Sequence, residues 1–365
     1  MRRVPALPLA LLLAVLACGD DEEELPPLTW TWVPIEGAVC GDGSPTGIGI
    51  ERGPGTSRDV LVFLMGGGAC FDALTCFLLP EPTASPGPYG AADLDRDMRG
   101  LAPGTLLDRT APENPYKELT FVFVPYCTGD VHAGDAVQTY PGAPGGRAWH
   151  HKGRVNLQRA FAHLATTLDP PQKVVISGAS AGGFGALLGF ELAKQAWPQA
   201  KGYLVDDSGP PIDAIPDLTV AAWYAAWDLG TAVNAICGDV DAPRCAGDLS
   251  LVFPALQGRY PSDRFALLSS TQDETMRGFF GALSLAPPYL VPMDAATFES
   301  GVRALVALLE DDAPPGESHA FVVAGTSHTM LGEPAAFTSQ GVALFEWLRQ
   351  QVEDDPAWAA AIPPP

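Results

Sequence analysis

The sequence is poor in positive charge. Lysine and arginine together account for 21 of its 365 residues, against 43 aspartates and glutamates, which gives a formal net charge of −22. Such a chain lacks the cations needed to neutralise a phosphate backbone, so we expect no nucleic-acid partner. The same charge would repel a highly charged polyuronate at low salt, although a solubilising surface is the more common reason for an acidic composition.

Metal- and nucleotide-binding patterns are also missing. The seven cysteines and six histidines form no tight CxxC pair and no His-x-x-x-His spacing. His150 and His151 are adjacent, so on a regular element their side chains would not share a face. The sequence contains no glycine-rich nucleotide fingerprint and no internal repeat. We therefore expect no metal and no organic cofactor.

The N-terminus has the pattern of an export signal rather than of folded structure. Arginines at 2–3 precede an apolar segment, residues 6–17, which is too short to span a membrane comfortably. This segment and Cys18 resemble a bacterial lipoprotein signal. We expect residues 1–17 to be removed and Cys18 to carry a lipid anchor on the periplasmic or cell-surface side, as the only membrane contact; simple secretion is the alternative. The acidic, proline-containing residues 18–34 would be a tether.

One folded domain is expected over residues 35–355. The chain is 47% apolar and 18% charged, and α/β folds of this size often remain single domains. Residues 212–259 are rich in tryptophan and alanine and predict a helical cap inserted between strands, with aromatic side chains that belong to the core or border a pocket. Residues 39–52 and 59–65 predict an entry hairpin, and residues 356–365 predict a disordered tail.

The most informative segment surrounds Ser180. An apolar strand at 173–177 feeds the turn Gly-Ala-Ser-Ala-Gly-Gly at 178–183, and a helix rich in alanine, leucine and glycine follows. Small residues must flank a serine at such an apex, because the turn is tight and the hydroxyl has to stand clear of the backbone. A glycine-rich turn beside a sheet is the alternative, but the strand and helix favour a nucleophile elbow.

A second glycine-rich turn follows the strand pattern of residues 59–65. It reads Gly-Gly-Gly-Ala-Cys at 66–70, and glycines after a strand let the backbone turn its N–H groups inward. In α/β-hydrolases a loop at this position completes an oxyanion hole, whose other donor is the N–H after the nucleophile. The hole would therefore consist of Gly67, Gly68 and Ala181, with a merely flexible turn as the alternative.

Two later strands each lead to a candidate catalytic side chain. Residues 264–270 precede Asp273, and residues 320–325 precede His328. Open α/β sheets gather functional groups past the C-terminal ends of their strands, and serine, aspartate, histidine is the chain order of the α/β-hydrolase triad. Asp207, which also follows a strand, is a rival acid. The pattern predicts an α/β-hydrolase-type fold, a mostly parallel sheet flanked by helices with a helical cap insertion.

Several segments of the chain together carry a family resemblance. They are Cys40–Pro45, Gly66–Cys70, Glu113–Tyr116, Pro125–Gly134, Gly178–Gly183 and Asp207–Gly209. In this order they closely resemble the pectin acetylesterase/Notum family of serine carboxylesterases, whose members remove O-acyl groups from acetylated plant polysaccharide or from a lipidated protein. The resemblance implies Ser180 as nucleophile, Asp273 as acid and His328 as base, with the oxyanion hole on the glycine loop and Ala181.

The chain departs from the family pattern near the expected pocket. The family usually has an aromatic residue close behind the three glycines, where this chain has Ala69, and tryptophan where His132 stands. We take Ala69, Asp130, His132 and Asp207 as candidate pocket residues. The mechanism should therefore transfer from the family better than the substrate does.

Cysteine usage fits an oxidising compartment. Without Cys18, an even number of cysteines remains, which by itself leaves their pairing open. The family resemblance implies the pairs Cys40–Cys127, Cys70–Cys76 and Cys237–Cys245. The pair Cys70–Cys76 would brace the proposed oxyanion loop.

The function expected from these features is that of an exported, monomeric serine esterase. It would remove O-acyl groups, most of all acetyl, from polysaccharide or small esters through an acyl-enzyme, so its partner is an acylated carbohydrate or a small ester. A longer-chain deacylase or a polyester-type hydrolase could use the same triad. A non-catalytic, lipid-anchored binding protein is the alternative from a different class.

Overall fold

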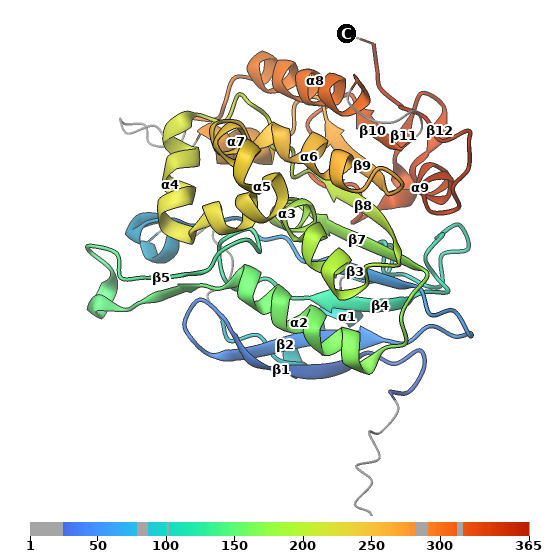
Figure 1. Ribbon diagram of the computed structural model, residues 1–365, viewed down its shortest axis with the longest axis horizontal. Helices are drawn as coiled ribbons and strands as arrows, with labels where there is room; N and C mark the ends of the chain where they lie inside the picture. The colour runs from blue at the N-terminus through green and yellow to red at the C-terminus, as the bar shows by residue number, and fades with distance from the viewer. Residues whose placement is uncertain (1–24, 79–86, 101, 282–290, 312–316, 365) are drawn as a thin grey trace, which may run out of the picture.

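An eight-stranded, mostly parallel sheet forms the centre of the structure, a computed structural model that describes residues 25–78, 87–100, 102–281, 291–311 and 317–364 (Figure 1). In spatial order the strands are β1 (Thr31–Val39), β2 (Pro45–Glu51), β4 (Thr120–Val124), β3 (Val60–Leu64), β7 (Lys173–Ala179), β8 (Lys201–Asp207), β9 (Arg264–Ser270) and β10 (Ser318–Val323). The strands from β4 to β10 pair in parallel, whereas β1 and β2 are antiparallel to their neighbours.

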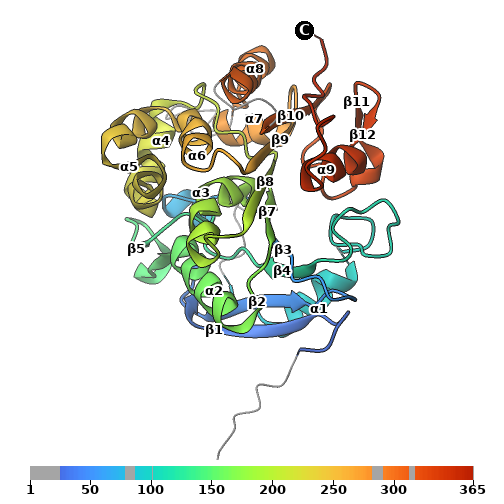
Figure 2. The same cartoon turned by 45° about the vertical axis from the view of Figure 1, so that its right-hand side comes forward.

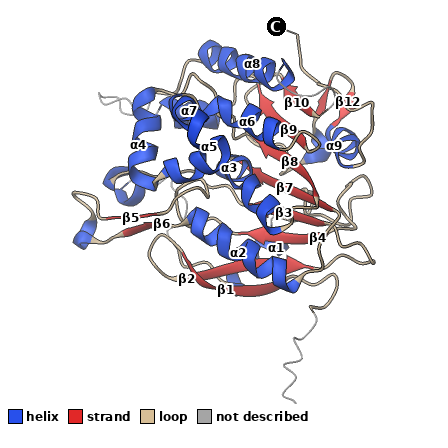
Figure 3. Cartoon of the chain, viewed as in Figure 1, coloured by secondary structure: helices blue, strands red, loops and turns tan. Residues whose placement is uncertain are grey.

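Helices cover both faces of this sheet (Figures 2 and 3). They are α1 (Ala91–Gly100), α2 (Gly153–Thr167), α3 (Ala181–Ala196), α4 (Asp217–Trp227), α5 (Leu229–Gly247), α6 (Val252–Arg259), α7 (Glu274–Gly281), α8 (Ala295–Asp311) and α9 (Leu344–Val352). Short elements complete the described chain: η1 (Leu74–Leu78), β5 (Ala136–Gln138), η2 (Pro144–Gly146), β6 (Trp149–His151), η3 (Leu249–Leu251), η4 (Pro334–Ala336), β11 (Thr338–Ser339) and β12 (Val342–Ala343). The predicted fold class is confirmed.

The central strands are apolar along their whole length because both of their faces are buried. Strand β3 reads VLVFL and strand β4 reads TFVFV. Side chains alternate between the faces, so Val174 and Ile176 of β7 pack in the core shared with α2 and α3, and Val175 packs in the core shared with α1 and α9. The apolar clusters on the two faces of the sheet together fix the positions of the strand ends.

The predicted entry hairpin is wrong in its second strand. Strands β1 and β2 form the hairpin, with Thr31 opposite Ile50. Strand β3, expected to pair with the β2 segment, is separated from it by β4 and runs parallel to β4 and β7. The length of the loop between β2 and β3 does not reveal this order, because β4, which follows both strands in the chain, lies between them in the sheet.

The expected cap consists of helices. α4, α5 and α6 lie between β8 and β9 in the chain, and α5 and α6 pack on α3 (Figure 1). α5 turns sharply at Gly238, which has φ 68° and ψ 173°. Among the described residues, no helix is both long and apolar enough to cross a membrane.

The expected tether of residues 18–34 is too long at its C-terminal end. Strand β1 begins at Thr31, and the ring of Trp32 lies 5.9 Å from that of Tyr89. Residues 1–17 and Cys18, with the expected signal and lipid anchor, lie outside the described residues.

The expected disordered tail is also wrong over much of its length. Ala361 donates its N–H to the carbonyl of Ala320 at 2.9 Å and accepts one from Val322 at 2.8 Å, along the outer edge of β10. Trp358 is buried. Backbone hydrogen bonds to the edge of β10 and burial of the Trp358 ring order this segment, although its proline content predicted disorder.

Three disulfides join Cys40 to Cys127, Cys70 to Cys76 and Cys237 to Cys245. These are the pairs that the family resemblance implies. The first ties the end of β1 to the segment after β4, the second closes the loop after β3, and the third closes the second half of α5. Disulfides of this kind persist in oxidising compartments.

Candidate active site

Ser180 occupies a strained turn between β7 and α3. Its backbone has φ 59° and ψ −120°, a conformation that is rare for a residue with a side chain and typical of a nucleophile elbow. The turn requires glycine at its flanks: a Cβ at Gly178 would lie 2.1 Å from the carbonyl oxygen of Gly182, and one at Gly182 would lie 2.0 Å from that of Leu64. The N–H of Ser180 donates to the carbonyl of Asp207 at 2.7 Å, which fixes the elbow to the end of β8.

Asp273 and His328 meet just past the ends of the parallel neighbours β9 and β10. Nδ1 of His328 lies 2.9 Å from Oδ2 of Asp273 and 3.1 Å from Oδ1. Asp273 is fully buried, and its Oδ1 also accepts the N–H of Met276 at 2.9 Å. A carboxylate at Nδ1 keeps that nitrogen protonated and leaves Nε2 to act as a base.

Asp207, the rival acid, is engaged elsewhere. Its Oδ2 accepts the backbone N–H groups of Met330 at 2.7 Å and Leu331 at 2.8 Å, and its Oδ1 accepts the hydroxyl of Ser208 at 3.0 Å. Burial raises the pKa of the Asp207 carboxyl to about 6, although these hydrogen bonds act in the opposite direction. The side chain therefore holds the segment that follows His328, while Asp273 bonds the imidazole itself.

The glycine loop after β3 is anchored through its carbonyl groups. Nε2 of His132 donates to the carbonyl of Met65 at 2.8 Å, and the hydroxyl of Tyr126 donates to that of Gly68 at 2.8 Å. Nε1 of Trp227 donates to the carbonyl of Cys70 at 2.6 Å. Carbonyl groups that are held in this way keep the peptide planes of the loop, and hence its N–H groups, in one orientation.

The backbone of this loop is compatible with an oxyanion hole. Gly67 and Gly68 have φ 148° and 84°, which L side chains rarely adopt. No acceptor for either N–H occurs among the residues that the structure describes. Ala181 begins α3, where N–H groups have no intrahelical acceptor.

A small cavity of about 10 Å³ brings the elbow and this loop together. Its walls are mostly apolar and are formed by Gly68, Ala69, Val131, Ser180, Ala181, Phe184, Trp223, Met276, Phe279 and Phe280. Met276 connects this cavity with the acid, since its N–H donates to Asp273. Such a space holds about one water-sized group.

Only one of the four candidate pocket residues, Ala69, lines this cavity. Asp130 is fully buried and accepts hydrogen bonds from the Thr128 hydroxyl at 2.6 Å and the Gly153 N–H at 2.7 Å, and burial raises its pKa to about 6. His132 is buried as well, and burial lowers its pKa to about 4, so it is neutral at pH 7. Asp130, His132 and Asp207 therefore support the surrounding loops from behind rather than forming the wall.

The sequence did not single out the hydrogen-bonding roles of Tyr126 and Trp227 or the cavity wall formed by Trp223. Tyr126 lies within a segment that carries the family resemblance, which was the available signal. For the aromatic residues of the cap the sequence favoured the core, with a place beside the pocket as the alternative; Trp227 is fully buried. Their partners lie far away in the chain, and local pattern contains no information on such pairs.

One group with the spacing of metal ligands occurs among the described residues: Cys70, Cys76 and His151. The two sulfurs are joined in a disulfide. Nδ1 of His151 donates to the carbonyl of Thr128 at 3.1 Å, and Nε2 accepts the hydroxyl of Tyr140 at 2.7 Å. All the potential ligand atoms of this group are therefore already engaged.

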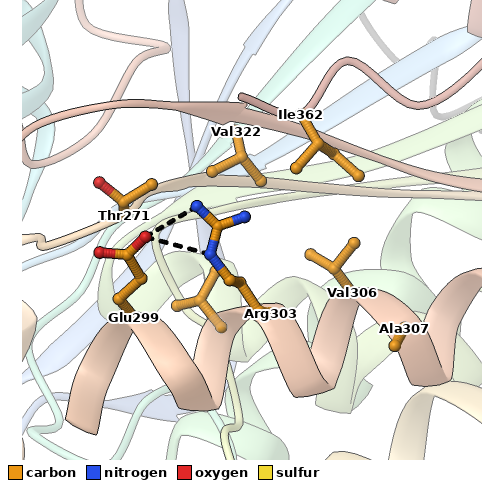
Figure 4. A pocket seen from close by; sticks show the side chains of 8 residues that line it. Thr271, Glu299, Arg303, Val306, Ala307, Val322 and Ile362 are labelled. Carbon is orange, nitrogen blue, oxygen red and sulfur yellow. Dashed lines mark hydrogen bonds and ion pairs between the residues drawn. The ribbon is translucent and has the colours of Figure 1, made fainter. Parts of the chain in front are cut away.

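A larger apolar cavity of about 170 Å³ lies apart from Ser180, between α8, β10 and the C-terminal segment (Figure 4). In Figure 4, Arg303 extends from α8 and pairs with Glu299, at 2.7 Å between Nη2 and Oε1. Oε2 of Glu299 accepts the side-chain amide of Gln272 at 3.2 Å. This ion pair therefore supports the loop that carries Asp273.

An elbow serine followed by a hydrogen-bonded acid and histidine at the ends of parallel strands defines a protein of the α/β-hydrolase class. Within that class, a model of the pectinacetylesterase family matches residues 26–224, more than half of the 365 residues, and the chain belongs to this family. The matched region includes Ser180 and the glycine loop and ends before Asp273 and His328.

Proteins of similar sequence are named either palmitoleoyl-protein carboxylesterases or pectin acetylesterases. The chain is 28% identical over 207 residues to palmitoleoyl-protein carboxylesterase notum1' of Xenopus laevis, covering 56% of this chain and 38% of that protein. It is 29% identical over 178 residues to palmitoleoyl-protein carboxylesterase NOTUM of Homo sapiens, covering 47% and 34%. It is 28% identical over 208 residues to pectin acetylesterase 11 of Arabidopsis thaliana, covering 54% and 49%. The chain thus spans between a third and a half of each of these relatives.

The solved structure of the Wnt deacylase Notum from Drosophila has a similar fold. It superposes with a TM-score of 0.60 and 20% sequence identity, over 90% of this chain and 93% of that chain. At this identity the likeness concerns the fold. The likeness covers a larger share of this chain than the family match at residues 26–224 does.

Proposed function

We propose that the protein is a serine carboxylesterase that releases short O-acyl groups, acetyl above all, from acylated carbohydrate or small esters. The observation that carries the proposal is the hydrogen-bonded pair of Asp273 and His328, past the ends of strands in the same sheet as the elbow of Ser180. Membership of the pectinacetylesterase family supports the reaction class.

The proposed reaction has two steps. His328 takes the proton of Ser180 through Nε2 while Oγ attacks the ester carbonyl, and Asp273 stabilises the resulting imidazolium. The N–H groups of Gly67, Gly68 and Ala181 stabilise the oxyanion. His328 then protonates the leaving alcohol, and a water activated by the same histidine hydrolyses the acyl-enzyme.

A short acyl group is supported by the size of the cavity beside Ser180. About 10 Å³ is room for one water-sized group, and the aromatic walls at Phe184 and Phe280 are buried. The sugar or alcohol part of a substrate would remain outside this space. A net charge of −22 favours a neutral or partly esterified carbohydrate over a highly charged one.

Long-chain deacylation is the second candidate, because several relatives are named palmitoleoyl-protein carboxylesterases. A chain of that length would require displacement of the walls that enclose the small cavity. We therefore rank this activity below acetyl release.

We also infer that the protein is exported, on the basis of its three disulfides. A lipid anchor at Cys18 would attach it to the cell envelope. Mass spectrometry of the protein from membranes tests the anchor, since a diacylated or triacylated N-terminal cysteine is expected.

The reaction is tested with a fluorophosphonate probe and a panel of 4-nitrophenyl esters from acetyl to palmitoyl, alongside acetylated xylan and pectin. The wild-type protein should be labelled covalently and should hydrolyse acetyl esters with the highest kcat/KM. Ser180→Ala should lose labelling and about a millionfold in kcat, with an unchanged circular dichroism spectrum.

Two results would contradict the proposal in different ways. A Ser180→Ala variant that keeps a tenth of the activity would remove the nucleophile assignment. A kcat/KM that rises steadily from acetyl to chains of about eight carbons or more would favour the long-chain deacylase.

A further inference from the structure

The segments that follow β9 and β10, which carry the proposed acid and base, run side by side. The N–H of Gln272 donates to the carbonyl of Gly325 at 2.9 Å, and that of Glu274 donates to the carbonyl of Thr326 at 3.1 Å. In both bonds the donor lies on the segment of the acid and the acceptor on the segment of the base. These bonds extend the parallel pairing of the two strands as far as the residues next to the acid.

One hydrogen bond joins the two segments in the opposite direction. The N–H of Gly325 donates to the side-chain hydroxyl oxygen of Thr271 at 3.1 Å. Among the N–H groups of residues 325–328, it is the only one with an acceptor within the described part of the chain. A side chain of the acid segment therefore holds the backbone that leads to the base.

Gly325 is a residue of the base segment that needs such a restraint. Its φ is 126°, a conformation that L side chains rarely adopt, and a Cβ at this position would meet no described atom within 4 Å. Glycine is therefore present for its backbone conformation, which is the least restricted of any residue, and packing on this side does not hold it. Because His328 follows three residues later, a rotation of the Gly325 peptide would move the imidazole.

Thr271 is suited to act as a fixed acceptor. It is 6% exposed, its own N–H donates to the carbonyl of Val323 at 2.9 Å, and its β-branched side chain has few rotamers. In Figure 4 it lies beside Glu299, whose Oε2 accepts the side-chain amide of Gln272 at 3.2 Å. Helix α8 thus adds a contact to the acid segment at the residue between Thr271 and Asp273.

We propose that Thr271 is a positioning residue for the esterase reaction, whose hydroxyl keeps the segment of His328 in register with that of Asp273. The inference rests on the proposed function, and Thr271 does not line the cavity beside Ser180. The acid–base hydrogen bond of 2.9 Å requires both segments in one relative position. Without the hydroxyl Gly325 can rotate, and the imidazole is aligned for a smaller fraction of the time. This lowers kcat, while the groups that bind substrate stay in place.

The test compares Thr271→Val, which removes the acceptor and keeps the shape of the side chain, with Thr271→Ser, which keeps the hydroxyl. Thr46→Val is the matched control. Thr46 is 7% exposed, and its hydroxyl donates to the carbonyl of Tyr89 at 3.1 Å from β2, near the opposite edge of the sheet. Kinetics with 4-nitrophenyl acetate give kcat and KM, and melting temperatures show whether each variant is folded.

Thr271→Val should lower kcat about tenfold to a hundredfold at an unchanged KM. Thr271→Ser should recover most of this loss, and Thr46→Val should match the wild type. A proton held between Nδ1 of His328 and the carboxylate of Asp273 resonates far downfield, and this signal should weaken in Thr271→Val alone. A folded Thr271→Val with the wild-type kcat, or an equal loss in all three variants, overturns the inference and leaves the esterase function standing.

A measurement on the wild type tests the inference if Thr271→Val does not fold. In hydrogen exchange followed by NMR, the N–H of Gly325 should exchange at least about tenfold more slowly than those of Thr326 and Ser327, which have no acceptor among the described residues. Equal exchange overturns the inference, because the hydroxyl then does not hold the glycine. A wild-type protein that neither reacts with a fluorophosphonate nor hydrolyses 4-nitrophenyl acetate overturns the proposed function itself, whatever the exchange of Gly325.

Discussion

Asp207 accepts a hydrogen bond of 2.7 Å from the backbone N–H of Met330, the second residue after His328. Ser208 adds to this contact, since its hydroxyl oxygen accepts the N–H of Thr329 at 3.1 Å. Thr329 has φ 62°, an unfavourable conformation that the surrounding hydrogen bonds hold. The end of β8 thereby positions both the elbow of Ser180 and the segment carrying the histidine.

The two buried aspartates should consequently differ in effect when mutated. Asp273→Asn should lower kcat about ten-thousandfold, because the imidazole loses the group that orients and stabilises it. Asp207→Asn should cost far less in kcat and more in thermal stability, because its partners are backbone N–H groups. Acetyl-ester kinetics and melting temperatures of both variants check this ranking. Were Asp207→Asn the more damaging to kcat while folded, the role of acid would pass to Asp207.

Mutation of the side chains that anchor the glycine loop should slow the chemical step more than it weakens substrate binding. Tyr126→Phe frees the carbonyl of Gly68, and His132→Phe frees that of Met65. Each should lower kcat by about tenfold to a hundredfold with little change in KM, because misdirected donors stabilise the oxyanion less. Inhibition by a boronic acid, which forms a tetrahedral adduct, should weaken in parallel.

Tyr203→Phe is the control for these anchors. The Tyr203 hydroxyl bonds Asp354 at 3.0 Å, and Tyr203 lies near the start of β8, at the opposite end from the elbow. Its kcat should match the wild type. A loss of kcat in Tyr203→Phe equal to that in Tyr126→Phe would mean that general destabilisation explains both.

Removal of either of two disulfides should destabilise the protein, but only one of the two removals should lower its activity. Each closes a short loop, so its removal should lower the free energy of unfolding by about 2 kcal/mol. Replacing Cys70 and Cys76 by alanine should also lower kcat tenfold or more, because the loop that follows the oxyanion donors loses its brace. Replacing Cys237 and Cys245 should leave kcat near the wild-type value at a temperature where both variants are folded.

The raised pKa of Asp130 predicts a pH dependence of stability. Its pKa is about 6 in the folded protein because of burial, against about 3.9 when unfolded. Between these values the folded state binds more protons, so this group stabilises the fold increasingly as pH falls from 6 to 4. Asp130→Asn cannot titrate. The free energy of unfolding of the variant, compared with that of the wild type, should therefore be more favourable at pH 8 than at pH 4 by about 2.4 kcal/mol, because the unfolded Asp130 is still about half ionised at pH 4.

Urea unfolding of the two proteins at pH 8, 6 and 4 measures this difference. The effects of other titrating groups cancel in the comparison, since both proteins share them. A wild-type-minus-variant difference that stays constant over this pH range would show that Asp130 titrates normally. A difference that grows in the opposite direction would mean that its hydrogen bonds outweigh its burial.

Local pattern was sufficient for the parts of the fold that depend on neighbours in the chain. The run at 173–177, the glycines on either side of Ser180 and the helix after it predicted the elbow, because its steric requirements lie within a few residues. The strand ends at Asp207, Asp273 and the segment before His328 were predicted in the same way. These elements sufficed to predict the fold class, and the quoted motifs to recognise the family.

Tertiary structure alone decided which of these residues meet and what else surrounds them. β4 separates β2 from β3, the edge of β10 orders the segment around Ala361, and Asp207 bonds Met330 rather than an imidazole. Trp223 lines the cavity of Ser180. Such contacts join residues that are distant in the chain, and their free energy arises only when two apolar surfaces pack, or when a donor and an acceptor are buried together. The sequence therefore determined the candidate chemistry through local geometry, whereas the partners of each side chain followed from the packing of the whole sheet.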